Sequence, residues 1–245
     1  MKWGSFGVVH IATLILAAAI IVGLYFALRR ASRKMQTIVL GVLSFSGIAA
    51  IIFNLITWGS PLEYLPLHLC SINALLLPIV VFSRNKTLGN LLLVWCLGAL
   101  AALVVNMAQA EYELNSWTFV FYYFPHVLEF GIPILLFRLG LIEKHPKYIL
   151  STIVITMIIY TGVHLANLGL NSYLESNQIL DYADNLIQVN YMYSITPENP
   201  LLALFWQVIP CQYWYMYMIV PILVIYLSLV YLPQILEARK QKATA

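Results

Sequence analysis

The chain has 245 residues, of which 62% are hydrophobic and only 9% are charged, and its mean hydropathy is +0.85. Soluble domains carry about a quarter charged residues, so this composition excludes a soluble globular domain and predicts a polytopic membrane protein. The net charge of +3 comes without a patch of basic and aromatic residues, so no nucleic-acid partner is expected.

Apolar runs of about twenty residues recur along the whole chain, and each is long enough to cross a bilayer as a helix. The third run is short. The first ends with Arg-Arg and has no cleavage site after it, which favours a mature helix over a signal peptide. We therefore expect an all-α fold, a single seven-helix transmembrane domain over 1–245, with spans at about 6–28, 36–57, 66–82, 88–107, 117–137, 148–170 and 210–232.

Basic residues indicate the orientation of these spans. The connections after spans one, three and five and the C-terminal tail hold twelve of the thirteen Lys and Arg residues, and only Lys2 lies on the other side. The positive-inside rule then places the N-terminus outside and the C-terminus in the cytoplasm of a multi-pass plasma-membrane protein. Merging or splitting one span would destroy this separation of charge.

One long connection, 171–206, is predicted to be external. It is acidic and contains many Tyr, Ile and Leu residues. This mixture predicts a short amphipathic helix near 178–189 that rests on the membrane surface, and it suggests a cap over a site that opens outward.

The fifth span contains an unusual pair of polar residues. His126 and Glu129 are three positions apart, so they share a helix face and can hydrogen-bond. Pro125 removes a backbone donor, and Gly131 and Pro133 loosen the next turn. Ionisable residues inside a membrane tend to face the bundle interior and to be functional. The structural alternative is a packed polar contact that stabilises the bundle.

The third span begins with a polar cluster rather than with apolar residues. Pro66 suits a first helical turn, and His68, Cys70, Ser71 and Asn73 follow it. Cys70 and Asn73 share a helix face, whereas His68 and Cys70 point about 200° apart. The positive end of the helix dipole favours the thiolate form of Cys70, which is the nucleophilic form.

The other two cysteines fit structural interpretations better. A lone cysteine usually behaves as a small buried hydrophobe, and Cys96 in the apolar run WCLGALAALVV matches that description. Cys211 precedes the aromatic run QYWYMYM, which is typical of a membrane interface. A disulfide between Cys70 and Cys211 is the alternative that would leave Cys70 unreactive.

Several short motifs resemble the YwaF-type bacterial integral membrane proteins. They are LPLHLC at the start of the third span, NYMYSITPENPLLALF in the long connection and IPCQYWYMYMIVP at the last span. Eukaryotic relatives of that family include a transmembrane acyltransferase that moves polyunsaturated chains onto lysophospholipids, and more distant relatives are androgen-induced-type hydrolases. The resemblance implies an active-site cysteine at Cys70 and a histidine at His126. The segment near 171–186 departs from the pattern.

Together these residues suggest a membrane-embedded lipid acyltransferase or lipid-ester hydrolase that needs no cofactor and no metal. His126, oriented by Glu129, would take the proton from Cys70, and the thiolate would attack an acyl ester to form a thioester. The expected partners are a phospholipid, a lysophospholipid or another fatty acyl ester, with the site toward the extracellular leaflet. Candidates for contacting the substrate or its oxyanion are His68, Asn73, Asn106 and Tyr123.

The predicted depths of the two main residues differ. Cys70 lies about 6 Å below Pro66, and His126 lies about 13 Å below Trp117, at the helical rise per residue. A helix tilt of about 20° would have to close this gap.

Rival classes use the same residues differently. A transporter or channel needs polar side chains at every depth, whereas these cluster in the outer halves of their spans, which favours a one-sided pocket. A receptor or structural membrane protein needs no reactive group. The polar pathway would comprise Asn54, Asn73, Asn106, His126, Glu129, His164 and Asn167. A metal site would comprise His68, His126, His164 and Glu129.

Overall fold

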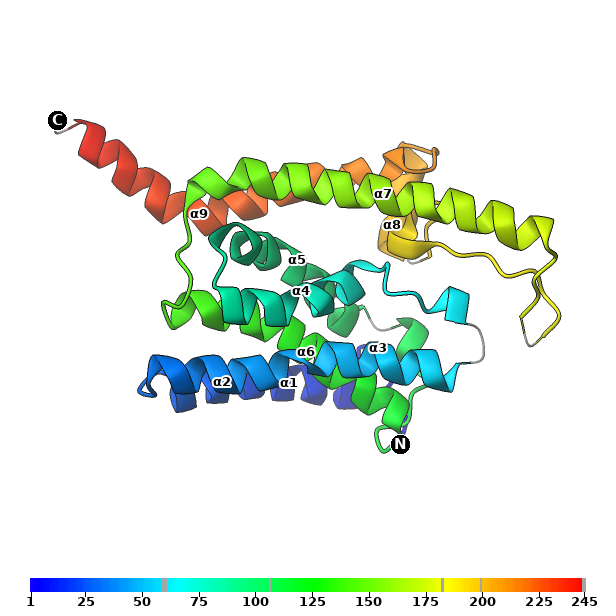
Figure 1. Cartoon of the computed structure of the whole chain (residues 1–245), viewed down its shortest axis with the longest axis horizontal. Helices are drawn as coiled ribbons and strands as arrows, with labels where there is room; N and C mark the ends of the chain where they lie inside the picture. Colours follow the sequence, from blue (N-terminus) through cyan, green and yellow to red (C-terminus); the bar gives the residue numbers. More distant parts are fainter. Residues whose placement is uncertain (59–60, 106, 182, 199, 244–245) are drawn as a thin grey trace. The chain divides into compact units, whose positions relative to one another are not determined.

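The computed structural model describes residues 1–58, 61–105, 107–181, 183–198 and 200–243 (Figure 1). Over these residues the chain is helical, and its only extended pairings are two isolated β-bridges. The expected all-α fold is thus confirmed. The α-helices are α1 (Val8–Leu28), α2 (Arg33–Ser44), α3 (Ser46–Thr57), α4 (Leu69–Ser83), α5 (Lys86–Val104), α6 (Trp117–Arg138), α7 (Ile149–Ser176), α8 (Pro200–Val208) and α9 (Ile219–Ala243).

Six segments of the described chain are apolar and long enough to cross a membrane. Each of the seven predicted spans coincides with one of these segments or with α4. The helix α4 has 15 residues, a length of about 22 Å, against a hydrocarbon core of about 30 Å. The six segments confirm a multi-pass membrane protein. The seventh span and the orientation of the termini stay predictions. The six segments are Val8–Leu28, Arg33–Thr57, Lys86–Val104, Trp117–Arg138, Pro146–Ser176 and Trp214–Leu236.

The chain divides into two compact units. Unit 1 comprises Met1–Thr57 and Leu69–Glu143, and unit 2 comprises Trp58–His68 and Lys144–Ala245. In unit 1, α6 is the central helix, because it packs against all of α1 to α5. The side chains of α6 that face these five helices are consequently surrounded by protein.

The predicted span 36–57 is interrupted near its middle. The helix α2 ends with Phe45 as its C-cap, whose N–H donates to the carbonyls of Val42 and Leu43, and α3 begins at Ser46. The two helices continue almost in line (Figure 1). Both contact α6, so this break lies beside the central helix of the unit.

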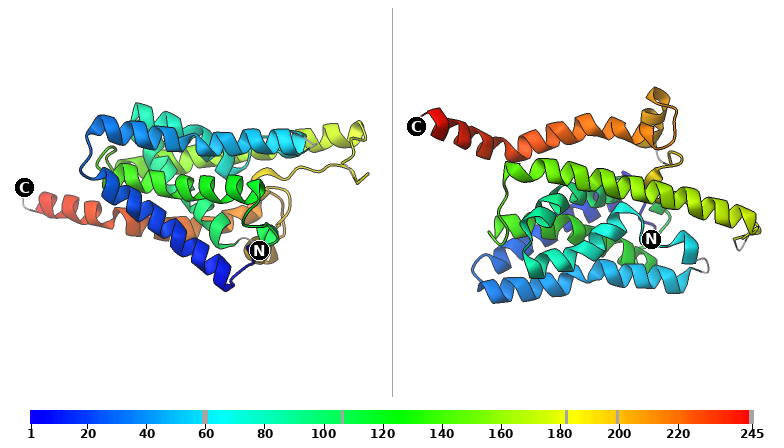
Figure 2. Two further views of the ribbon diagram at one scale, coloured as in Figure 1. Left: turned by 90° about the horizontal axis from the view of Figure 1, so that it is seen from below. Right: turned by 45° about the horizontal axis from the view of Figure 1, so that its top comes forward.

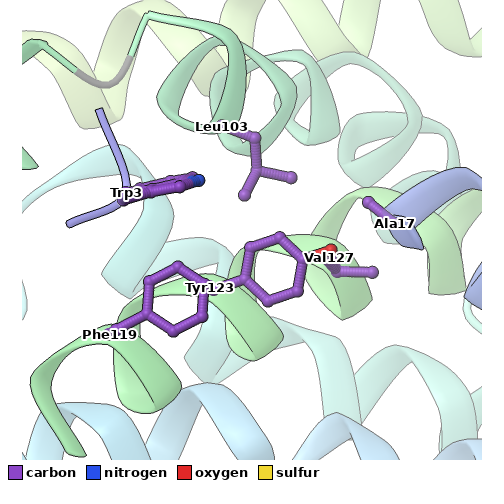
Figure 3. Close-up of a cluster of buried hydrophobic side chains, with 6 residues drawn as sticks. All are labelled: Trp3, Ala17, Leu103, Phe119, Tyr123 and Val127. Atoms are coloured by element: carbon purple, nitrogen blue, oxygen red, sulfur yellow. The ribbon is translucent and has the colours of Figure 1, made fainter. Parts of the chain in front are cut away.

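The N-terminal segment of unit 1 packs against α6 through Trp3. This indole is 1% exposed and lies edge-on to the rings of Phe119 and Tyr123 (Figure 3). Its Nε1 donates a hydrogen bond of 2.8 Å to the hydroxyl of Thr13. Aromatic pairs of this kind contribute about 0.5–1.5 kcal/mol each beyond the area that they bury. The N-terminal segment, α1 and α6 are thereby held as one cluster.

In unit 2, the long helix α7 anchors the connection that follows it (Figure 2). The amide of Asn167 donates to the carbonyl of Tyr191 and to the hydroxyl of Ser194, and it accepts the N–H of Tyr191. Asn171 makes a similar pair of hydrogen bonds with the backbone of Val189. The two asparagines satisfy backbone groups that would otherwise be unpaired in a buried loop.

The amphipathic helix expected near 178–189 is absent from the described part of that segment, so this prediction was wrong. The segment folds back on itself instead, with a β-bridge between Leu180 and Leu186. At the turn, the Asp181 carboxylate accepts the N–H groups of Asn185 and Ala183, and these hydrogen bonds lower the pKa of Asp181. An aspartate that binds nearby backbone donors favours a turn over a helix.

Candidate active site

The structure brings Cys70, His126 and Glu129 together inside unit 1. Cys70 is the second residue of α4, and the other two lie in the middle of α6. One atom from each side chain, the Cys70 Sγ, a ring nitrogen of His126 and a carboxyl oxygen of Glu129, all lie within 4.8 Å of one another. The difference in depth expected from the sequence is closed by the packing of α4 directly against α6.

The start of α4 differs from the sequence prediction. The helix begins at Leu69 rather than at Pro66, and Pro66 and Leu67 form a turn before it. Cys70 therefore lies in the first helical turn, where backbone N–H groups have no partner within the helix. This end of the helix favours negative charge on a nearby side chain.

The ring of His126 is held by the backbone of its own helix. Its Nδ1 lies 2.6 Å from the carbonyl oxygen of Tyr122, and a carbonyl can only accept, so Nδ1 carries the hydrogen. In the neutral ring the lone pair is then on Nε2, the nitrogen that can take a proton. The residue spacing predicts this orienting role for Glu129, whereas the contact with the Tyr122 carbonyl has no signal in the sequence.

Glu129 is 3% exposed, and its Oε2 has no hydrogen-bond partner in the described structure. Its Oε1 lies against α3 at Gly47. A Cβ atom added to Gly47 would be 2.7 Å from Oε1 and 2.5 Å from the Cβ of Ala74 on α4. Real Cβ atoms essentially never approach so closely. Gly47 therefore makes room for the Glu129 carboxyl group and for the contact between α3 and α4.

Asn73 is a further buried polar residue on α4. It is 0% exposed, and neither its amide nitrogen nor its amide oxygen has a partner among the described residues. Three positions after Cys70, it shares a helix face with the thiol. Buried polar groups are almost always hydrogen-bonded, so an unpaired one calls for an explanation, and a polar ligand or a water molecule is one.

The other predicted site residues have different surroundings. Tyr123 lies in the Trp3 cluster, where its hydroxyl donates to the carbonyl of Thr13 at 2.5 Å. His68 belongs to unit 2, where its Nδ1 accepts the N–H of Met192 and its ring lies edge-on to Tyr191. His68 also lines a polar cavity of about 200 Å³ in that unit. Asn106 lies outside the described residues.

All three cysteines are free thiols in the structure. Cys96 is 0% exposed, and its Sγ donates to the carbonyl of Leu93 at 3.2 Å. This packed thiol matches the structural interpretation given for it. Cys211 is exposed. Cys70 differs from both, because a histidine and a carboxyl group lie beside it.

Comparison with known proteins gives one match. The model of the TMEM164 family matches residues 5–231, which is nearly the whole chain. The chain belongs to the TMEM164 family. No curated protein and no solved structure matches it.

Membership in this transmembrane family agrees with the six long apolar helices. The matched region contains all three residues of the Cys70 cluster, by which we mean Cys70, His126 and Glu129. The resemblance to YwaF-type proteins and to the acyltransferase stays a prediction.

The close approach at Gly47 leads to a stability prediction. Gly47→Ala should lower the free energy of unfolding by about 1–3 kcal/mol, the usual cost of overpacking a well-packed interior. The matched control is Gly23→Ala in α1, where a Cβ meets nothing within 4 Å. That change should be neutral, or stabilising by about 0.5–1 kcal/mol. The measurement is the thermal unfolding midpoint in detergent, and equal midpoints for the two variants would contradict the close approach of α3 to Glu129.

Proposed function

We propose that this protein is a membrane-embedded lipid acyltransferase or lipid-ester hydrolase in which Cys70 is the nucleophile and His126 is the base. The observation that carries this proposal is the Cys70 cluster, with its three functional atoms within 4.8 Å of one another. A nucleophile and a base close together, with the base fixed by a third group, are the usual signature of covalent catalysis. Here the third group is the carbonyl of Tyr122.

In the first half-reaction, Nε2 of His126 takes the proton from the Cys70 thiol. The thiolate attacks the carbonyl carbon of an acyl ester, and the C–O bond to the lipid alcohol breaks. The alcohol oxygen takes the proton back from His126, and the acyl chain remains on Cys70 as a thioester.

In the second half-reaction, the hydroxyl of a lysophospholipid or of water gives its proton to His126 and attacks the thioester. The C–S bond breaks, the thiolate is protonated from His126, and an ester or a free fatty acid leaves. The Asn73 amide supports both steps, because its buried N–H groups have no partner among the described residues and can stabilise the oxyanion that forms at the carbonyl.

Glu129 has a supporting role in this scheme. When His126 holds the proton of the thiol, the imidazole ring carries a positive charge inside the bundle, where an isolated charge is costly. The buried carboxyl group within 4.8 Å of the ring nitrogen compensates this charge. It acts in the transition state rather than in the resting enzyme.

Cys70 lies in the first turn of α4, which begins beside the middle of α6. A lipid ester would therefore reach the thiol by entering the bundle from the end where α4 begins. We place this end at the extracellular leaflet of the plasma membrane. With α4 as a seventh span, twelve of the thirteen basic residues fall on the cytoplasmic side.

The chemistry is tested by turnover. The purified protein in nanodiscs, with a labelled phospholipid as donor and a lysophospholipid as acceptor, should transfer the label as detected by mass spectrometry. Cys70→Ala and His126→Ala should each abolish transfer, because each removes a reacting group. Cys211, whose thiol is exposed, serves as the control, and the Cys211→Ala protein should transfer the label normally. Full transfer by folded Cys70→Ala protein would refute the proposal.

A second prediction concerns Glu129. The Glu129→Gln protein should fold normally and transfer acyl groups about 10- to 1,000-fold more slowly, a smaller loss than in serine triads because a thiol ionises more easily than a hydroxyl. Turnover and the unfolding midpoint are measured on the same preparation. Normal turnover per folded molecule together with a lower midpoint would make Glu129 a packing residue only.

A third prediction concerns the orientation. Reporters fused after Lys34, after Lys86 and at the C-terminus should all read cytoplasmic, and a reporter near Asp181 should read external. A cytoplasmic signal near Asp181 would change the number of spans and move the site to the other leaflet.

A further inference from the structure

We infer that the Cys70 cluster binds a thiophilic divalent cation of the Zn²⁺ type, with the Cys70 Sγ, the His126 Nε2 and a carboxyl oxygen of Glu129 as its protein ligands. Thiolate, imidazole and carboxylate are the three side-chain ligand types of zinc in proteins. In the described part of the chain, these residues offer three such atoms within 4.8 Å of one another. No metal is expected from the sequence, and the alternative set of His68, His126, His164 and Glu129 is divided between the two units.

The spacing of the ligands suits zinc after a small adjustment. Zinc binds sulfur at about 2.3 Å and nitrogen or oxygen at about 2.0–2.2 Å. Tetrahedral bonds of these lengths place the ligand atoms about 3.3–3.7 Å apart. The observed separations, up to 4.8 Å, exceed these values by about 1 Å, so the side chains must close in by about that amount when the cation binds.

The hydrogen bond of His126 matches the arrangement found around zinc ligands. A metal-bound histidine almost always donates its other ring N–H to a carboxylate, a carbonyl or water, which fixes the ring and its tautomer. The Nδ1 of His126 donates in this way to the carbonyl of Tyr122 at 2.6 Å. The lone pair of Nε2 is therefore directed away from this carbonyl and is available to a cation.

Glu129 gives an independent indication of a ligand. Glu129 is only 3% exposed, and its Oε2 has no hydrogen-bond partner in the described structure. A buried polar atom without a partner loses its hydration without compensation, which destabilises the fold. A cation at the Cys70 cluster would satisfy this oxygen.

The charges favour a divalent, soft cation. A thiolate, a carboxylate and a neutral imidazole together carry two negative charges, so a complex with Zn²⁺ is neutral and is less costly to bury than any of its ions alone. Binding releases the proton of the thiol, and of the carboxyl group where it is protonated, to solvent. Magnesium and calcium prefer oxygen ligands and are expected to bind weakly.

The consequence for acyl transfer rests on the proposed function. A bound cation occupies the sulfur lone pair that attacks the ester and the nitrogen lone pair that takes the proton. Zn²⁺ should thus be a reversible inhibitor, and chelation should restore the activity.

The site is tested by Co²⁺, which replaces zinc and absorbs light when a thiolate binds it. Titration of the full-length protein in detergent should give a sulfur-to-cobalt charge-transfer band that saturates at one equivalent and is displaced by Zn²⁺. Cys70→Ser should abolish the band. Glu129→Gln should leave the thiolate ligand in place and weaken binding by at least about 100-fold, because it removes the charged carboxylate ligand, and even the loss of an outer-shell partner costs about 10–100-fold. Cys96→Ala and Cys211→Ala should bind as the unchanged protein does.

The two proposals can fail separately. One equivalent of Co²⁺ bound through Cys70, in a protein that transfers no acyl group in chelator, would uphold the cation site and refute the proposed function. A charge-transfer band that survives in folded Cys70→Ser protein would overturn the inference. So would the absence of any band from a protein that is active in chelator and insensitive to Zn²⁺.

Discussion

The close approach of three helices at one point brings the side chains of the Cys70 cluster together. Gly47 on α3 and Ala74 on α4 leave no room for another carbon atom beside the carboxyl group of Glu129 on α6. Because helices α3 and α4 are packed on the centre of α6, the thiol of Cys70 is carried to the middle of the same helix that holds His126. Neither α4 nor α6 alone holds both the Cys70 thiol and the His126 imidazole.

The same packing buries polar groups at a cost in the free energy of folding. Glu129 and Asn73 are buried with polar atoms that have no partner among the described residues, although an apolar residue in either place would remove that penalty. The proposed function accounts for them, because an oxyanion or a cation would pair with these atoms. The Cys96 thiol differs, because its Sγ already donates a hydrogen bond to the carbonyl of Leu93 in its own helix.

Hydropathy predicted the helices well, because a span needs length and apolar composition and both are local properties of the sequence. The polar residues in spans three and five, and the resemblance carried by LPLHLC, singled out Cys70 and His126 before the structure brought them together. The Tyr122 carbonyl was not predictable, since a backbone acceptor leaves no mark in the sequence. Gly47 was missed because its importance comes from Ala74 and Glu129, which are distant in sequence. The helix expected near 178–189 does not form, because the Asp181 carboxylate accepts backbone N–H groups and the chain turns there.

The central claim is that Cys70 carries the acyl chain, and capture of that intermediate tests it most directly. The protein is incubated in chelator with a phospholipid that has a deuterated acyl chain and without an acceptor, then quenched in acid and digested. The account predicts that the deuterated chain is found on the peptide that contains Cys70, and that neutral hydroxylamine removes it as expected for a thioester. A protein that turns over this phospholipid, but whose Cys70 peptide remains unmodified while the label is on another residue or on none, would contradict the account.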